Sequence, residues 1–189
     1  MNSPRPLPRL LLVLAAVAAV VLGLVSPASA AEPYCGITWG SLPKEGVGGS
    51  SSDWASVTDV RSGQHDCYDR LVVDLAGTSG AGYLVQYVPE VISDPKGDPV
   101  PLRGGAFLQI VVRVPSYDQA GNSTFNPADP QELVNTTGYA TFRQAASAGG
   151  FEGTTQFGLG VRARLPFRVF NPAGPGSGGR LVLDVAHAW

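Results

Sequence analysis

The sequence predicts an all-β protein: a β-sandwich of short antiparallel strands that carries one disulfide. Two observations predict the fold class. The 189 residues include 24 Gly and 16 Pro, which disfavour long helices, and short segments of alternating apolar and polar residues are separated by turn-forming residues. A third observation, the presence of Cys35 and Cys67 in an exported chain, predicts the disulfide.

Residues 1–30 have the features of a secretory signal peptide. The run from Leu10 to Leu24 has no charged or polar side chain, follows Arg5 and Arg9, and leads to a small-residue cleavage site that ends at Ala30. It is shorter than the ~20 apolar residues that a membrane-spanning helix needs. We therefore expect a mature protein that is secreted to the cell wall or the extracellular space, with no membrane partner after signal cleavage.

Both cysteines remain in the mature chain. Because an exported protein meets an oxidising compartment, we expect Cys35 and Cys67 to form a disulfide, which stabilises the fold by about 3 to 4 kcal/mol in the chain-entropy model. Lipid attachment to Cys35 is the alternative, but this residue lies five positions after Ala30 rather than directly after it. A metal site built on two cysteines alone is weaker still.

The mature chain divides into an N-terminal segment with a Gly/Ser linker, residues 31–54, and a sandwich domain, residues 55–189. Residues 62–65 have turn chemistry, and residues 116–137 are polar and read as a surface loop. Residues 141–148 fit a helix or a strand, and we favour the strand. The alternation predicts strands at 55–61, 68–75, 83–88, 107–114, 141–148, 156–161, 166–170 and 180–186.

Two of these strands repeat one pattern. Residues 70–76 and 180–186 both read Arg-Leu-Val, an apolar residue, Asp, an apolar residue and Ala. In a strand, the arginine, the first valine and the aspartate lie on one face, and three aliphatic residues lie on the other. We assign the aliphatic face to the core and the charged face to the outside of a sheet. The charged residues are either solvated and paired across strands or form a repeated binding surface: Arg70, Asp74, Arg180 and Asp184.

The charge of the mature chain argues against nucleic acid as a partner. Without the signal peptide, 11 basic residues face 15 acidic residues, a net charge of −4 that is spread without runs. Phosphate binding depends on clustered Lys and Arg.

The sequence has none of the common catalytic motifs. His65 lies in a hairpin turn beside Asp66, and His187 lies close to the end of the chain, where termini are poorly fixed. His65, Asp66 and Asp69 offer three metal ligands within five residues, but turn chemistry explains them better, since a structural ion needs a fuller shell. We expect no enzyme activity, no catalytic residues, no metal and no cofactor.

Aromatic residues are frequent in the N-terminal half. Such rings stack on the apolar faces of sugars as well as filling cores. For Trp39 and Trp54 we expect the core position, because bulky aromatic residues usually dominate core burial.

Four segments taken together resemble the AMIN-like domains of exported actinobacterial proteins. The resemblance covers roughly residues 34–187. It rests on Tyr34-Cys35-Gly36-Ile37-Thr38-Trp39-Gly40-Ser41, on 60–66 with 69–74, on Gly150-Phe151-Glu152-Gly153 with Pro166-Phe167-Arg168-Val169-Phe170, and on 180–187.

AMIN-like domains are named for their similarity to the AMIN module, the non-catalytic β-sandwich that targets periplasmic amidases to the cell wall and is understood to bind peptidoglycan. The resemblance implies that Arg70, Asp74, Arg180 and Asp184 lie on outer sheet faces that contact the wall. The sequence departs from the amidases because no amidase catalytic domain follows, so we expect a free-standing envelope protein.

Two arrangements of the repeated strands are open. As antiparallel neighbours, they would place Arg70 opposite Asp184 and Asp74 opposite Arg180. The family resemblance suggests instead that each strand belongs to a different sheet, and we favour this arrangement, in which the charges stay available to a ligand. Exposed ion pairs contribute at most about 1 kcal/mol, so removal of Arg70 and Arg180 should leave folding nearly intact.

The sequence therefore predicts an exported, non-catalytic cell-envelope binding module whose partner is peptidoglycan or another cell-wall polymer. The alternatives are a protein-interaction domain that binds envelope proteins and a small secreted enzyme of unrecognised type.

Overall fold

The computed structural model describes residues 32–48, 54–174 and 178–189. The predicted signal peptide, residues 1–30, and residues 49–53 of the predicted linker lie outside these ranges. Residues 33–189 belong to one compact unit. Within the described ranges, no helix has both the length and the apolar character needed to cross a membrane.

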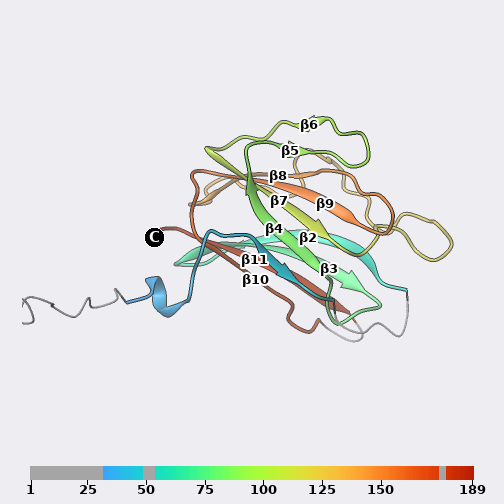
Figure 1. Cartoon of the computed structure of the whole chain (residues 1–189), viewed down its shortest axis with the longest axis horizontal. Helices are drawn as coiled ribbons and strands as arrows, with labels where there is room; N and C mark the ends of the chain where they lie inside the picture. Colours follow the sequence, from blue (N-terminus) through green and yellow to red (C-terminus); the bar gives the residue numbers. More distant parts are fainter. Residues whose placement is uncertain (1–31, 49–53, 175–177) are drawn as a thin grey trace, which may run out of the picture. The chain divides into compact units, whose positions relative to one another are not determined.

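The described residues form two packed antiparallel sheets, which confirms the predicted all-β sandwich (Figure 1). The five-stranded sheet has the order β1-β4-β7-β9-β8, and the four-stranded sheet has the order β10-β11-β3-β2. A small two-stranded sheet, β5-β6, completes the fold. The strands are β1 (Lys44–Gly46), β2 (Ser56–Gln64), β3 (Tyr68–Ala76), β4 (Tyr83–Val88), β5 (Val91–Ile92), β6 (Pro99–Val100), β7 (Ala106–Val112), β8 (Phe142–Ser147), β9 (Thr155–Val161), β10 (Phe167–Phe170) and β11 (Gly179–Ala186).

The main core lies between the two large sheets. Alternate residues of each strand point inward, because successive side chains of a strand face opposite sides of the sheet. Three phenylalanines at its centre have no exposed surface: Phe142, Phe157 and Phe167. In β2 the register shifts between Val57 and Asp59, a bulge that leaves both Val57 and Val60 buried although they are three residues apart.

A second, smaller core lies on the other side of the five-stranded sheet. Residues 89–105, which include β5 and β6, cover this outer face and bury Val91, Val100, Ala146 and Ala148 (Figure 1). Two glycines of β9 permit the close approach. A Cβ at Gly158 would lie 2.8 Å from Leu102 Cδ1, and a Cβ at Gly160 would lie 1.9 Å from the carbonyl oxygen of Arg103.

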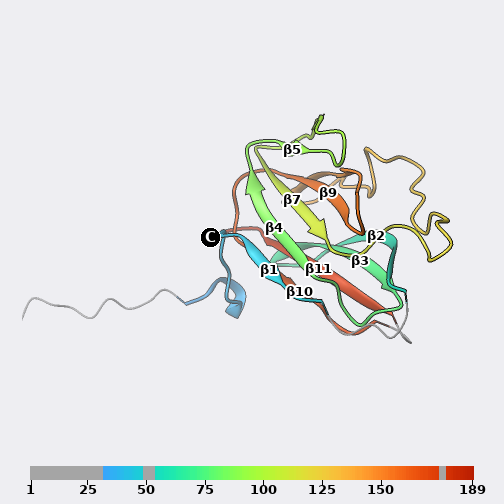
Figure 2. The same ribbon diagram turned by 45° about the vertical axis from the view of Figure 1, so that its right-hand side comes forward.

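The N-terminal segment is part of the sandwich. It begins with a one-turn 3-10 helix, η1 (Tyr34–Gly36), and the predicted disulfide joins Cys35 to Cys67 in the turn between β2 and β3. The segment then pairs with the edge of β10, where Phe167 N–H donates to the carbonyl of Gly40, and continues as β1 on the edge of β4 (Figure 2). One side of the sandwich is closed in this way.

The predicted strands correspond closely to those observed. Residues 62–64, predicted as a turn, extend β2 instead, and the turn is confined to residues 65–67. Residues 141–148 contain a strand, as favoured. The three short strands β1, β5 and β6 were not predicted, because two or three residues are too few for an alternation to be recognised.

Candidate functional site

The two repeated strands lie side by side in one sheet, so the arrangement favoured from the sequence is wrong. β3 and β11 are antiparallel neighbours, and the register places Arg70 opposite Asp184, Val72 opposite Val182 and Asp74 opposite Arg180. Their aliphatic residues face the core as predicted. Their charged residues alternate with these core-facing residues and therefore share the outer face of the four-stranded sheet, on the side away from the five-stranded sheet. Figure 1 shows the two sheets packed against each other.

We call this outer face the arginine face. Its pattern continues onto both flanking strands, because Arg168 pairs with Asp184, Phe170 with Val182, and Arg61 with Val72. The arginine face is defined by four arginines, three aspartates and three aromatic rings: Arg61, Arg70, Arg168, Arg180, Asp59, Asp74, Asp184, Trp39, Tyr68 and Phe170.

A carboxylate between two guanidinium groups is at the centre of this face. Arg70 donates through Nε and Nη2 to the two oxygens of Asp184, at 2.6 and 2.9 Å, and Arg168 Nε donates to Oδ2 at 2.8 Å. The Asp184 side chain is completely buried, whereas those of Arg70 and Arg168 are 26% and 31% exposed. The hydrogen bond to Asp184 raises the pKa of Arg70 above its usual value.

This burial corrects the expectation that the charges are all solvated. Asp184 is covered because the two arginine side chains lie across it. The two valines beside it on the outer face are also shielded from solvent. Val72 and Val182 are only 5% and 3% exposed, although they lie on the outer face. Arg70→Ala would remove one of the two cationic partners of a buried carboxylate, so we expect loss of Arg70 to destabilise the fold rather than to leave it nearly intact.

Aromatic rings surround the two central arginines. The Arg168 guanidinium lies 5.5 Å from the ring centre of Trp39, 5.3 Å from that of Tyr68 and 5.1 Å from that of Phe170. Arg70 lies 5.2 Å from Tyr68 and 5.6 Å from Phe170. Such cation–π contacts hold guanidinium groups flat on the face.

The disulfide helps to place Trp39 on this face. Cys35 is tied to the β2–β3 turn, one residue before Tyr68. Trp39 then packs against Tyr68 with ring centres 6.0 Å apart, and its indole N–H donates to the carbonyl of Tyr34 at 2.8 Å. Trp39 is therefore partly buried, but against the arginine face rather than in the core.

Arg180 differs from the other three arginines. The Asp74 carboxylate, which lies opposite Arg180 in the register, bonds instead to Arg61, with Nε to Oδ2 at 2.5 Å and Nη2 to Oδ1 at 3.0 Å. Arg180 Nη2 donates only to the carbonyl of Ala173, at 3.1 Å, and its buried Nε has no hydrogen-bond partner in the described part of the chain. No carboxylate within the described ranges pairs with Arg180.

The arginine face is positively charged in a chain that is negative overall. Four arginines exceed three aspartates there by one charge, whereas the predicted mature chain carries −4. The face therefore favours anionic groups among the ligands it meets.

A family model for the AMIN-like domain matches residues 55–187. The chain belongs to the AMIN-like domain family. The match contains both repeated strands and, apart from Trp39, the whole arginine face. AMIN-like domains are associated with cell-wall amidases and with the cell envelope. No curated protein and no solved structure matches the chain significantly.

Four residues of the arginine face were predicted from the sequence, and the others were not. Arg70, Asp74, Arg180 and Asp184 were predicted from the repeat, and the fold brings all four together. Arg61, Arg168 and Phe170 were missed, although Arg168 and Phe170 alternate with the core-facing Phe167 and Val169 in a segment already predicted to be a strand. These side chains lie on the same face as the repeat because β10 is the neighbour of β11 and β2 is the neighbour of β3.

His65, Asp66 and Asp69, which the sequence analysis attributes to turn chemistry rather than to a metal site, do not form a cluster of ligands in the described residues. His65 stacks on Tyr68 with ring centres 4.5 Å apart, whereas Asp69 points to the opposite face of β3 and is completely buried. Its carboxylate accepts hydrogen bonds from the N–H groups of Thr141 and Phe142, at 2.6 and 3.0 Å, and contacts His187 Nε2 at 3.0 Å. His187 is therefore held in place, contrary to the expectation for a chain end. The described residues contain no cluster of three or more metal-ligating side chains.

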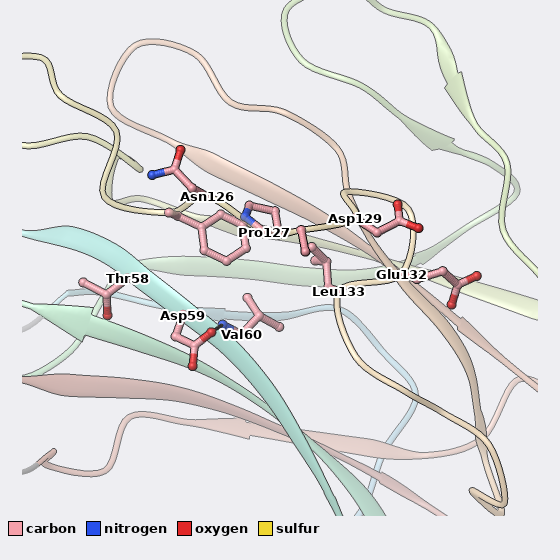
Figure 3. Close-up of a pocket in the computed structure, with 10 residues that line it drawn as sticks. Thr58, Asp59, Val60, Asn126, Pro127, Asp129, Glu132 and Leu133 are labelled. Carbon is pink, nitrogen blue, oxygen red and sulfur yellow. Dashed lines mark hydrogen bonds between the residues drawn. The ribbon is translucent and has the colours of Figure 1, made fainter.

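A cavity of about 370 Å³ lies at the edge of β2 and shares Asp59 with the margin of the arginine face. Figure 3 shows Thr58, Asp59 and Val60 of β2 across from Asn126, Pro127 and Leu133 of the long loop. Its lining has three carboxylates, of which Glu132 is paired with Arg103. Because no cation in this lining offsets Asp59 and Asp129, the cavity disfavours anionic ligands.

Proposed function

We propose that this protein is an exported, non-catalytic module of the cell envelope that binds peptidoglycan or another wall polymer through the arginine face. Binding needs no cofactor or metal. The arginines hold carboxylate groups of the polymer, such as those of peptidoglycan stem peptides, and the rings of Trp39, Tyr68 and Phe170 contact its apolar parts.

The observation that carries this proposal is the position of Arg180. It lies on the positively charged sheet face with no carboxylate partner in the described ranges, four residues along β11 from Asp184, which orients Arg70 and Arg168. A guanidinium group binds a carboxylate through two parallel hydrogen bonds. Binding to this face costs less side-chain entropy because the Arg70 and Arg168 guanidinium groups are already ordered before the ligand arrives. The family's association with cell-wall amidases supports a wall polymer as the ligand.

The test is cosedimentation of the mature protein with purified peptidoglycan. We expect Arg180→Gln to fold like the parent, because Arg180 makes a single hydrogen bond to a backbone carbonyl. We expect its affinity for the wall material to fall by about tenfold or more, because a hydrogen-bonded ion pair is lost. The matched control is Lys96→Gln, which removes one positive charge from an exposed turn and should bind like the parent.

Equal binding of the parent and a folded Arg180→Gln variant contradicts the arginine face as the binding surface. If the parent does not sediment with peptidoglycan but retains envelope proteins in an Arg180-dependent way, the same face serves protein interaction instead. Hydrolysis of wall material by the purified protein contradicts the non-catalytic proposal.

A further inference from the structure

Two exposed aromatic rings lie together at one end of the sandwich, apart from the arginine face. Trp54, just before β2, is 48% exposed, and Tyr117, in the long loop after β7, is 38% exposed. Their ring centres are 6.1 Å apart and their planes are inclined by 42°. Trp54 was expected in the core, and this expectation is wrong. The residue precedes β2, so the alternation of that strand does not turn its side chain inward.

Hydrogen bonds fix the Trp54 ring and the backbone of the loop that carries Tyr117. The indole N–H of Trp54 donates to the carbonyl of Tyr117 at 2.8 Å. The Tyr117 loop is held by Asp118, whose carboxylate accepts from the N–H groups of Ala120 and Asn122 at 2.9 and 2.8 Å. The hydrogen bond that the Asn122 side-chain amide donates to Asp118, together with these backbone bonds, lowers the pKa of Asp118 below its usual value. The rings thus form a preorganised pair, and little entropy is lost when a ligand contacts them.

A hollow of about 250 Å³ adjoins the rings. Its lining includes Arg113, Pro115 and Gly153, and a Cβ at Gly153 would meet nothing within 4 Å. Arg113 is the one charged residue in the lining, and it is paired with Glu45 at 2.5 Å, with 46% and 61% of the two side chains exposed. The hollow therefore combines two apolar ring faces with hydrogen-bonding groups and has no net charge.

We infer that the Trp54–Tyr117 pair is a binding site for an uncharged sugar unit of a glycan chain. A pyranose ring with equatorial hydroxyl groups has an apolar C–H face that stacks on an aromatic ring, and its hydroxyl groups, at the edge, accept hydrogen bonds from Arg113 and donate to its partner Glu45. A neutral hollow suits a neutral ligand. This site is separate from the arginine face, and the inference does not rest on the function proposed there.

The size of the hollow argues for a sugar rather than a protein partner. It is lined by seven residues, whereas a standard protein interface contributes about 20 to 30 residues from each side. It is also slightly smaller than typical pockets for drug-sized ligands, about 300 to 1,000 Å³, which corresponds to one sugar unit at a time.

The test is calorimetric titration of the mature protein with the trisaccharide of N-acetylglucosamine, an uncharged probe. We expect Trp54→Ala and Tyr117→Ala each to weaken binding by about tenfold, because each removes one stacking ring. The matched control is Trp189→Ala. Trp189 is also exposed, at 72%, and its indole N–H also donates to a backbone carbonyl, that of Arg164, but it does not line the hollow.

Weaker binding by both ring variants, with normal binding by Trp189→Ala and by Arg180→Gln, supports the site. The inference is overturned if the parent does not bind the trisaccharide, if folded Trp54→Ala and Tyr117→Ala bind it like the parent, or if Trp189→Ala weakens binding equally. A dimer of the parent that dissociates on Trp54→Ala, without sugar binding, also overturns it in favour of a protein contact. Arg180→Gln separates the two proposals, because it affects wall binding at the arginine face alone.

Discussion

The outer faces of the two large sheets differ in what covers them. The five-stranded sheet is covered by residues 89–105, and glycines at 158 and 160 let the covering backbone approach β9. The four-stranded sheet has no such layer among the described residues, and its outer face is closed by the side chains of Arg61, Arg70, Arg168 and Phe170. The outer face of the five-stranded sheet thus forms part of a buried core. The arginine face stays accessible to solvent and carries charged groups.

The difference shows that an outward strand face does not have to be apolar to be well packed. Val72 and Val182 are as buried as core residues, because long arginine side chains cover them with their apolar stems. The same side chains hold their charged ends at the surface. A face of this kind presents ordered guanidinium groups to a ligand, which the covered face does not offer.

The largest expected effect concerns the covered face. Gly160→Val should destabilise the protein by at least about 3 kcal/mol, because the new side chain would overlap the carbonyl of Arg103, a backbone atom that cannot move without displacing the covering segment. The measurement is urea unfolding followed by tryptophan fluorescence.

Gly63→Ala is the matched control on the uncovered face. A Cβ at Gly63 meets only His65 Nε2, at 3.9 Å, and Gly63 is also a strand residue. We expect this variant to be neutral or more stable by about 0.5 kcal/mol, because alanine restricts the unfolded chain. Similar losses for both glycine variants would contradict the difference between the two faces.

A smaller effect is expected within the arginine face itself. Asp184→Ala should cost about 2 kcal/mol, because it leaves Arg70 and Arg168 facing each other without an anion between them; their partial exposure keeps the cost below that of a fully buried pair. Asp74→Ala should cost less than about 1 kcal/mol, since its partner Arg61 is 50% exposed. Thermal unfolding of the two variants side by side checks this order, and equal losses would mean that Asp184 is not the central anion.

The smallest effect concerns an exposed ion pair that joins the covering segment to the long loop. The hydrogen bond from Arg103 lowers the pKa of Glu132 below its usual value of 4.5. The stabilisation is therefore present above pH 4.5 and is lost as the pH falls through the lowered pKa of the folded state. Arg103→Gln should remove this part of the acid sensitivity, with an effect smaller than that of Asp184→Ala. Identical acid unfolding profiles for the parent and the variant would show that the pair contributes nothing.

Much of the secondary structure was predictable because alternation is a local property. The strands β3, β4 and β11 were predicted within one residue at each end. The disulfide was also predictable, since the sequence has only two cysteines and predicts that the chain is exported. The short strands β1, β5 and β6 were not, because their pairing depends on distant segments rather than on their own residues.

The candidate site was predictable in part. The repeat identified Arg70, Asp74, Arg180 and Asp184 and the face on which they lie. It did not show that β3 and β11 are neighbours, that Asp184 is completely buried, or that Asp74 bonds to Arg61 and leaves Arg180 without a carboxylate. Each of these depends on strands that are more than 100 residues apart or on which of two arginines, from the two strands that flank β3, bonds to the Asp74 carboxylate.

The sequence by itself determined which residues form strands, which face of each strand is apolar, and which cysteines pair, because these follow from side-chain chemistry and from spacing along the chain. Only the tertiary structure decided which outer sheet face is covered by a chain segment and which stays exposed with its charged groups. The reason is physical: a strand's two faces are defined by its own alternation, but its neighbours and covering layers are set by the packing of the whole sandwich. Arg168, Asp184 and Arg70 come from three different strands, and they become one site only when β10, β11 and β3 are adjacent.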